Sequence, residues 1–100
     1  MLKAFDHIAV PMKQIELMTS FYEALGCKIL DQGRIKAAVF GNNKINFHLP
    51  ELWNDQEFNL RGHTAVPGSG DICFVWDGTQ EALMQTLEVA GAEIELGPVR

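Results

Sequence analysis

The stretch that decides the fold is FDHIAVPMKQIELMTSFYEALGCKI, residues 5–29. The segment from Ala4 to Met12, with which this stretch begins one residue in, is rich in residues that favour strands, and Pro11 ends it. From Gln14 to Leu25 the apolar residues instead recur at helical spacing, and Gly26 stands where a helix commonly ends. The stretch therefore predicts a strand and a helix, followed by the start of a second strand.

Three short strand candidates follow the predicted helix. They are CKILD (27–31), IKAAVFG (35–41) and KINFHL (44–49). Gln32-Gly33 and Gly41-Asn42-Asn43, which separate them, are both typical turn sequences. Residues 4–49 therefore form a predicted β-α-β-β-β module.

A second, similar pattern begins after a long irregular segment. Residues 50–69 show no periodicity, and a loop of this length either joins two units or covers a functional site. DICFVWDG (71–78) then predicts a strand, Thr79 to Ala90 predicts a helix with Thr79 as its N-cap, and AEIEL (92–96) begins another strand.

The two halves can be compared position by position. Asp71 corresponds to His7 at an offset of 64, and Gly91 corresponds to Gly26 at an offset of 65. By the same offset, residues 70–100 lack the last two strands of a complete β-α-β-β-β module. The sequence thus predicts one domain that consists of a first module, a linker and an incomplete second module.

Composition limits the classes of function. The chain has 100 residues, a formal net charge of −5 and no apolar run long enough for a membrane span, so neither nucleic acid nor a membrane is an expected partner. The N-terminus has no signal-peptide pattern, which predicts a cytoplasmic location. Cys27 and Cys73 lie far apart in apolar stretches and are both expected to be packed thiols.

The segments FDHIAV, FYEALGCKI, KINFHLPE, AVPGSGDICFVWDG and GAEIELGPV together resemble the vicinal oxygen chelate superfamily. This superfamily includes glyoxalases, bleomycin-resistance proteins and extradiol dioxygenases, and the resemblance is greatest to its small glyoxalase domain-containing proteins. The resemblance implies an α+β fold of paired βαβββ modules whose sheets curl into a cup. In the superfamily the cup holds a divalent metal ion that chelates two adjacent oxygens of a substrate.

The resemblance also implies positions for the metal ligands. His7 aligns with a ligand histidine and is expected on the strand face opposite Ile8 and Val10, although a structural histidine bonded to backbone is the alternative. A carboxylate position of the superfamily falls on Asn46, and an amide is a poor ligand for transition metals. His48 is expected on the same strand face as Asn46 and is a second candidate ligand, or else a satisfied polar residue at a strand end.

Asp71 takes the place of a second histidine of the superfamily and is a candidate ligand for Mn or Mg, or a simple turn residue. A fourth ligand, a glutamate on a later strand, has no counterpart in this sequence. Cys73 is expected to point into the cup without a histidine to activate it. Arg61 in the long loop either meets an anionic substrate over the cup or is solvated.

Two hypotheses follow from these residues. In the first, the protein is a lyase, isomerase or dioxygenase that uses a divalent metal ion (Mn, Fe, Ni, Zn or Mg) held by His7, His48 and Asp71. In the second, a metal-free module on the same scaffold holds a small apolar or cationic ligand in the cup, or serves for dimerisation, without catalysis. Asn46, Cys73 and Arg61 are the candidate substrate-binding residues. Because an incomplete second module leaves a sheet edge to be covered, we expect a homodimer, with exchange of strands between chains as one arrangement. The alternatives are that the polypeptide is a truncated fragment, or that the remaining residues exist but are not in this sequence.

Overall fold

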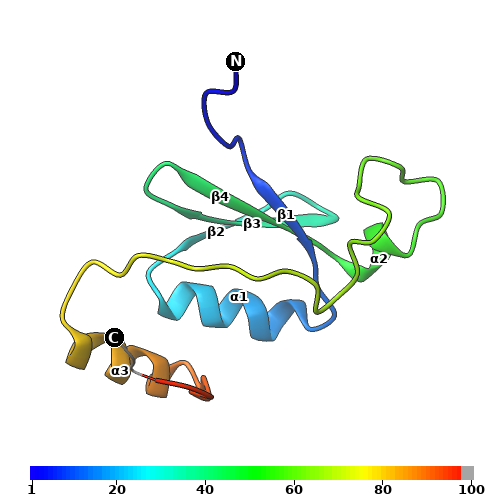
Figure 1. The fold of residues 1–100 in the computed structure, drawn as a ribbon. Helices are drawn as coiled ribbons and strands as arrows, with labels where there is room; N and C mark the ends of the chain where they lie inside the picture. The colour runs from blue at the N-terminus through cyan, green and yellow to red at the C-terminus, as the bar shows by residue number, and fades with distance from the viewer. Residues whose placement is uncertain (98–100) are drawn as a thin grey trace.

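A four-stranded sheet with a helix packed along one face forms the body of the molecule (Figure 1). The structure is a computed structural model that describes residues 1–97. Its elements are β1 (Ile8–Pro11), α1 (Ile15–Ala24), β2 (Lys28–Asp31), β3 (Ile35–Phe40), β4 (Asn43–His48), α2 (Pro50–Trp53) and α3 (Gln80–Val89). The β-α-β-β-β order predicted for residues 4–49 is confirmed.

The strands are arranged in the order β1-β4-β3-β2. β1 runs parallel to β4, whereas β3 is antiparallel to both β4 and β2. The parallel pair is possible because α1 carries the chain from the end of β1 across the sheet to β2 on the opposite edge. β4 therefore lies in the interior of the sheet. The longest buried run of the described residues, 45–49, begins in β4 and ends one residue after it.

The face of the sheet that contacts α1 carries the hydrophobic core. Ile45 and Phe47 of β4, Ala38 of β3 and Tyr22 of α1 form its buried centre. The rings of Tyr22 and Phe47 lie 5.2 Å apart between centroids. Apolar residues at helical spacing on α1 pack around this centre, as the periodicity predicts.

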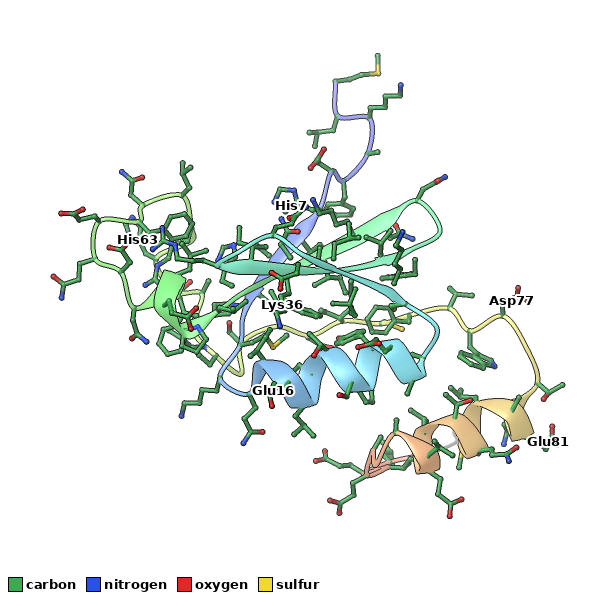
Figure 2. The ribbon with its side chains drawn as sticks, turned by 180° about the vertical axis from the view of Figure 1, so that it is seen from behind. His7, Glu16, Lys36, His63, Asp77 and Glu81 are labelled. Atoms are coloured by element: carbon green, nitrogen blue, oxygen red, sulfur yellow. The ribbon has the colours of Figure 1, made fainter. Side chains whose placement is uncertain are left out.

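The opposite face of the sheet carries most of the polar candidates, and we call it the open face. Because side chains alternate along a strand, Asn46 and His48 point away from the core that holds Ile45 and Phe47. Figure 2 shows His7 on this side of the sheet and Lys36 on the side of α1. The expected division of β4 into an apolar and a polar face is confirmed.

The second half of the chain differs from the prediction. Residues 71–76 are extended beside α1 but form no strand, and residues 92–96 form none either (Figure 1). The alternation of side chains predicts the two faces of a strand, but a strand also needs a neighbouring backbone with which to form hydrogen bonds. The described residues provide no such neighbour for residues 71–76 or 92–96. Phe74 nevertheless packs against Tyr22 and Phe40, at 6.1 Å and 5.7 Å between ring centroids. The division into two modules stays a prediction.

α3 begins where the sequence predicts. The Thr79 side chain accepts a hydrogen bond from the Ala82 backbone N–H at 3.1 Å, which confirms it as the N-cap. α3 lies beside α1 and contains no buried residue. Among residues 1–97, no helix has the length and apolar character needed to span a bilayer.

Candidate functional site

The candidate site lies on the open face at the middle and end of β4. Asn46 is 7% exposed and His48 is 5% exposed. Asn46 is paired with Ala9 on one neighbouring strand and with Ala37 on the other. Both neighbouring residues on this face have small side chains.

The Asn46 side chain has an unmet hydrogen-bonding requirement. Its Oδ1 atom is buried and has no hydrogen-bond partner among the described residues. A buried polar atom without a partner costs about 1–3 kcal/mol and is rare in native proteins. Asn46 Oδ1 is therefore a buried acceptor whose hydrogen-bonding requirement the described residues leave unmet.

His48 lies two residues further along the same face and is partly covered by the loop that follows β4. The Phe58 ring packs edge-to-face against the imidazole, with 5.5 Å between ring centroids. Burial lowers the pKa of His48, and the charges of His7 and Arg61 lower it further. The imidazole is therefore neutral at neutral pH and offers one donor and one acceptor nitrogen.

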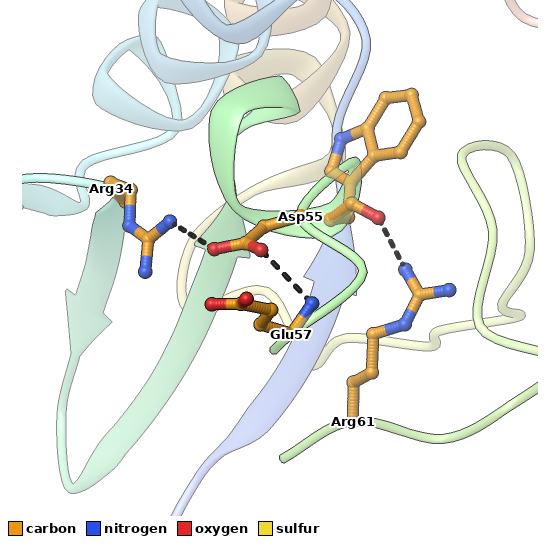
Figure 3. Close-up of polar contacts among 5 residues, drawn as sticks. Arg34, Asp55, Glu57 and Arg61 are labelled. Atoms are coloured by element: carbon orange, nitrogen blue, oxygen red, sulfur yellow. Dashed lines mark hydrogen bonds and ion pairs between the residues drawn. The ribbon is translucent and has the colours of Figure 1, made fainter. Parts of the chain in front are cut away.

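The loop over this end of the sheet is fixed by two hydrogen bonds at Trp53. The indole Nε1–H of Trp53 donates to the Met12 carbonyl at 3.0 Å, which ties α2 to the segment after β1. Arg61 Nη1 donates in turn to the Trp53 carbonyl at 2.8 Å (Figure 3). Arg61 is thereby held close enough to His48 for its charge to affect that residue's pKa.

A separate ion pair fixes the start of the same loop. Arg34 Nη1 donates to Asp55 Oδ2 at 2.9 Å, and Asp55 Oδ1 accepts from the Glu57 backbone N–H at 3.0 Å (Figure 3). The hydrogen bond from Arg34 is the main reason why the pKa of Asp55 lies below its usual value of 3.8. The two hydrogen bonds that Asp55 accepts therefore fix the start of the loop at the end of the sheet near His48.

His7 and Cys73 line a hollow of about 340 Å³, together with Lys44. His7 immediately precedes β1, is exposed, and its Nδ1 lies 2.7 Å from Asp6 Oδ1. Cys73 is exposed, so the expectation that both cysteines are packed is wrong for this one. Its extended segment has no strand beside it to cover the thiol.

The described residues do not supply a complete metal site. Residues 1–97 contain no group of three or more His, Cys, Asp or Glu side chains placed to hold a metal ion. His7 and His48 share the open face, while Asp71 is exposed in the extended segment after the loop. His7 and His48 could each offer one imidazole nitrogen, whereas the neutral Asn46 amide is a poor ligand for transition metals, so the described residues leave the donor set incomplete.

Three residues of the site region carry roles that the sequence did not predict. Phe58 covers His48, Asp55 holds the loop through Arg34, and Trp53 anchors α2. Each role depends on a contact between two residues that lie 10 to 41 positions apart in the sequence. The only sequence signal is the presence of two isolated aromatic residues in a polar loop.

Fold and site together define a small α+β protein with a glyoxalase-like βαβββ module. No family model matches the chain. The chain is 31% identical to glyoxalase domain-containing protein RDO1 of Mycosarcoma maydis, over 99% of this chain and 54% of that protein. It is 34% identical to virulence protein STM3117 of Salmonella typhimurium, over 94% of this chain and 64% of that protein. The chain therefore spans less than two thirds of both curated relatives.

This chain is also similar to solved structures. An integron cassette protein from the mobile metagenome of V. cholerae superposes with a TM-score of 0.82 and 33% identity, over 99% of this chain and 76% of that one. The crystal structure of STM3117 superposes with a TM-score of 0.81 and 31% identity, over 99% and 77% of the two chains. The chain belongs to the glyoxalase-like proteins of the vicinal oxygen chelate superfamily, as its sequence motifs imply.

Proposed function

We propose that the open face of the sheet binds a small polar molecule through Asn46 and His48, without the need for a bound metal ion. The observation that carries this proposal is the buried Oδ1 atom of Asn46, which has no partner among residues 1–97. A ligand that donates a hydrogen bond to this atom removes the cost of leaving it unsatisfied. The neutral His48 ring, two residues away, supplies a second polar contact.

The alternative is the metal-dependent enzyme of the glyoxalase or dioxygenase type, with His7, His48 and Asp71 as ligands. It is favoured by the presence of two histidines on one face of the sheet, near enough for the charge of His7 to lower the pKa of His48. A metal there would serve as a Lewis acid toward two adjacent oxygens of a substrate. The lack of a third protein ligand among the described residues places this candidate second.

Metal titration separates the two candidates. Protein treated with a chelator is titrated with Mn²⁺, Ni²⁺ and Zn²⁺ by calorimetry, in parallel with the His7→Ala and His48→Ala variants. The proposal predicts no stoichiometric binding that depends on both histidines. Tight binding of one metal per chain that is lost in both variants would establish the alternative instead.

Ligand binding itself is tested by NMR. Backbone amide shifts of the full chain are recorded with a panel of small hydroxylated compounds, and hits are repeated with Asn46→Ala. Asn43→Ala is the matched control, since Asn43 is exposed at the start of the same strand. We expect shifts around residues 46–48 that disappear in Asn46→Ala and persist in Asn43→Ala; shifts unaffected by Asn46→Ala would contradict the proposal.

A further inference from the structure

We infer that the α1 side of the sheet holds a second binding site, for a small aromatic molecule that carries one hydroxyl group. The site is a hollow of about 540 Å³ between the end of β1, the helix α1 and the segment 67–74, which runs beside α1 (Figure 1). We call it the α1-side hollow. Its lining includes none of the open-face candidates, so the inference is independent of the proposed function.

The segment 67–74 is held against both of the other walls. Gly70 lies next to β1, where a Cβ atom in place of its hydrogen would be 3.6 Å from Val10 Cγ1. Phe74 packs edge-to-face against Tyr22 of α1, with 6.1 Å between ring centroids. The α1-side hollow is therefore formed before any ligand binds, as is usual for small-molecule sites.

The lining of the α1-side hollow is mainly apolar and suits an aromatic ring. Its apolar side chains include Val10, Met12, Met18, Ile72 and Phe74. None of these five is fully buried, so each has surface that a ligand can cover. The two methionines are flexible, and their sulfur atoms make favourable contacts with aromatic rings.

The Tyr22 hydroxyl supplies one polar group within this apolar lining. Tyr22 is 7% exposed, and its hydroxyl forms no hydrogen bond among residues 1–97. The hydroxyl is not sealed off, because Asn46 Oδ1 is the one fully enclosed side-chain polar atom without a partner in that range.

The position of Tyr22 in α1 directs its hydroxyl into the α1-side hollow. Long side chains of a helix point back toward its N-terminus, and Lys13, Gln14 and Met18, at and before the first turns of α1, line the hollow together with Tyr22. Burial raises the pKa of Tyr22, so the hydroxyl keeps its proton and can both donate and accept a hydrogen bond. A hydroxyl on the ligand matches it.

The charges around the α1-side hollow favour a neutral ligand. Lys13 is the one charged side chain in the lining that the structure describes, and it is exposed to solvent. A charged ligand would lose its hydration at the apolar lining without a buried partner of opposite charge. A neutral phenol needs a partner for its hydroxyl alone, which Tyr22 provides.

The test compares a phenol with the hydrocarbon of the same shape. 4-Methylphenol and toluene are each titrated into the full chain, and backbone amide shifts are recorded by NMR. We expect both to shift residues 10–22 and 68–74, with the phenol bound about fivefold more tightly because of its hydrogen bond to Tyr22. Tyr22→Phe, which keeps the ring, should remove this preference and leave the affinity for toluene unchanged.

A second pair of variants tests the apolar wall. Met18→Gln should weaken the binding of both compounds, because an amide in the wall must be desolvated. Leu17→Gln is the matched control, since Leu17 is 62% exposed and lies outside the α1-side hollow. The melting temperature of each variant checks that the fold is kept.

Three results would overturn the inference. The first is equal affinity of 4-methylphenol for the wild-type chain and for Tyr22→Phe. The second is a set of shifts confined to residues outside 10–22 and 68–74. The third is a shift of these same amides when the protein concentration alone is raised, because a second copy of the chain would then occupy the α1-side hollow.

Discussion

Asn46 combines two properties that are seldom found together in a stable sheet. It is buried in β4, an interior strand, and its side-chain oxygen has no partner among the described residues. Asparagine also has a low preference for strands. A residue that has a low strand preference and a buried oxygen without a hydrogen bond lowers the stability of the protein. Such a residue is typical of a functional site.

Removal of this amide should therefore stabilise the protein without ligand. Asn46→Val replaces the amide with a strand-forming apolar group of similar size, and we expect the free energy of unfolding to rise by about 1 kcal/mol. Urea denaturation monitored by circular dichroism measures the change. Asn43→Val is the control at an exposed position of the same strand. An equal or lower stability of Asn46→Val would mean that the Asn46 amide is already satisfied.

The two cysteines should differ in reactivity. Burial raises the pKa of the Cys27 thiol, whereas Cys73 is exposed. Because the thiolate is the reactive form, iodoacetamide at pH 8 should modify Cys73 before Cys27 in the folded protein. Peptide mass spectrometry over a time course measures both rates, with urea-unfolded protein as the reference in which the rates converge. Equal rates in the folded state would contradict this structure.

The Arg34–Asp55 ion pair gives a dependence on pH with a defined sign. The pKa of Asp55 in the folded state is below 3.8, so the pair stabilises the protein above that pH, and its contribution is lost as pH falls through the lowered pKa. Arg34→Gln should raise the pKa of Asp55 toward 3.8, as measured by carboxyl-carbon NMR. The pKa of Asp6, which its hydrogen bond to His7 lowers, should stay unchanged in this variant.

At the scale of elements, α3 is held less firmly than the sheet. It has no buried residue, whereas β4 consists largely of buried ones. Regions with few buried contacts open without global unfolding. α3 and β4 should therefore belong to different cooperative units of the fold.

Hydrogen exchange tests this difference. Amides of α3 should exchange faster than those of β4, and Thr79→Ala should accelerate exchange in α3 further, because loss of an N-cap costs a helix about 1 kcal/mol. The midpoint of global unfolding should hardly move. A large drop in global stability for Thr79→Ala would instead show that α3 is part of the main cooperative unit.

Elements that depend on local patterns were predictable from the sequence, and those that depend on distant contacts were not. The alternation of residues 44–49 was sufficient to place Asn46 and His48 on one face, and Gly26, with a φ of 100°, ends the turn after α1 as expected. The segment around Phe74 has an equally good strand pattern, but its backbone has no partner among the described residues. Phe58 and Arg61 acquire their roles only because the chain folds back over the end of β4.

At the scale of the whole molecule, the feature that requires explanation is an apolar surface beside β1. β1 is an edge strand of the described sheet. The hollow next to it is lined by apolar side chains that are 40% to 99% exposed, namely Phe5, Ile8, Phe74 and Val75. An open strand edge next to exposed apolar side chains favours pairing with another chain. We therefore propose that two copies of this protein associate through the β1 edge, with exchange of strands as one form of that pairing.

Sedimentation velocity tests this association. We expect the wild-type chain to sediment as a dimer at tens of micromolar, and Val75→Lys to shift it toward monomer, because a charge at the centre of the interface must be desolvated. Val89→Lys is the matched control, since Val89 is also exposed, at 80%, but lies on α3 away from this hollow. A wild-type chain that sediments as a monomer, or equal dissociation of both variants, would exclude the β1 edge as the interface.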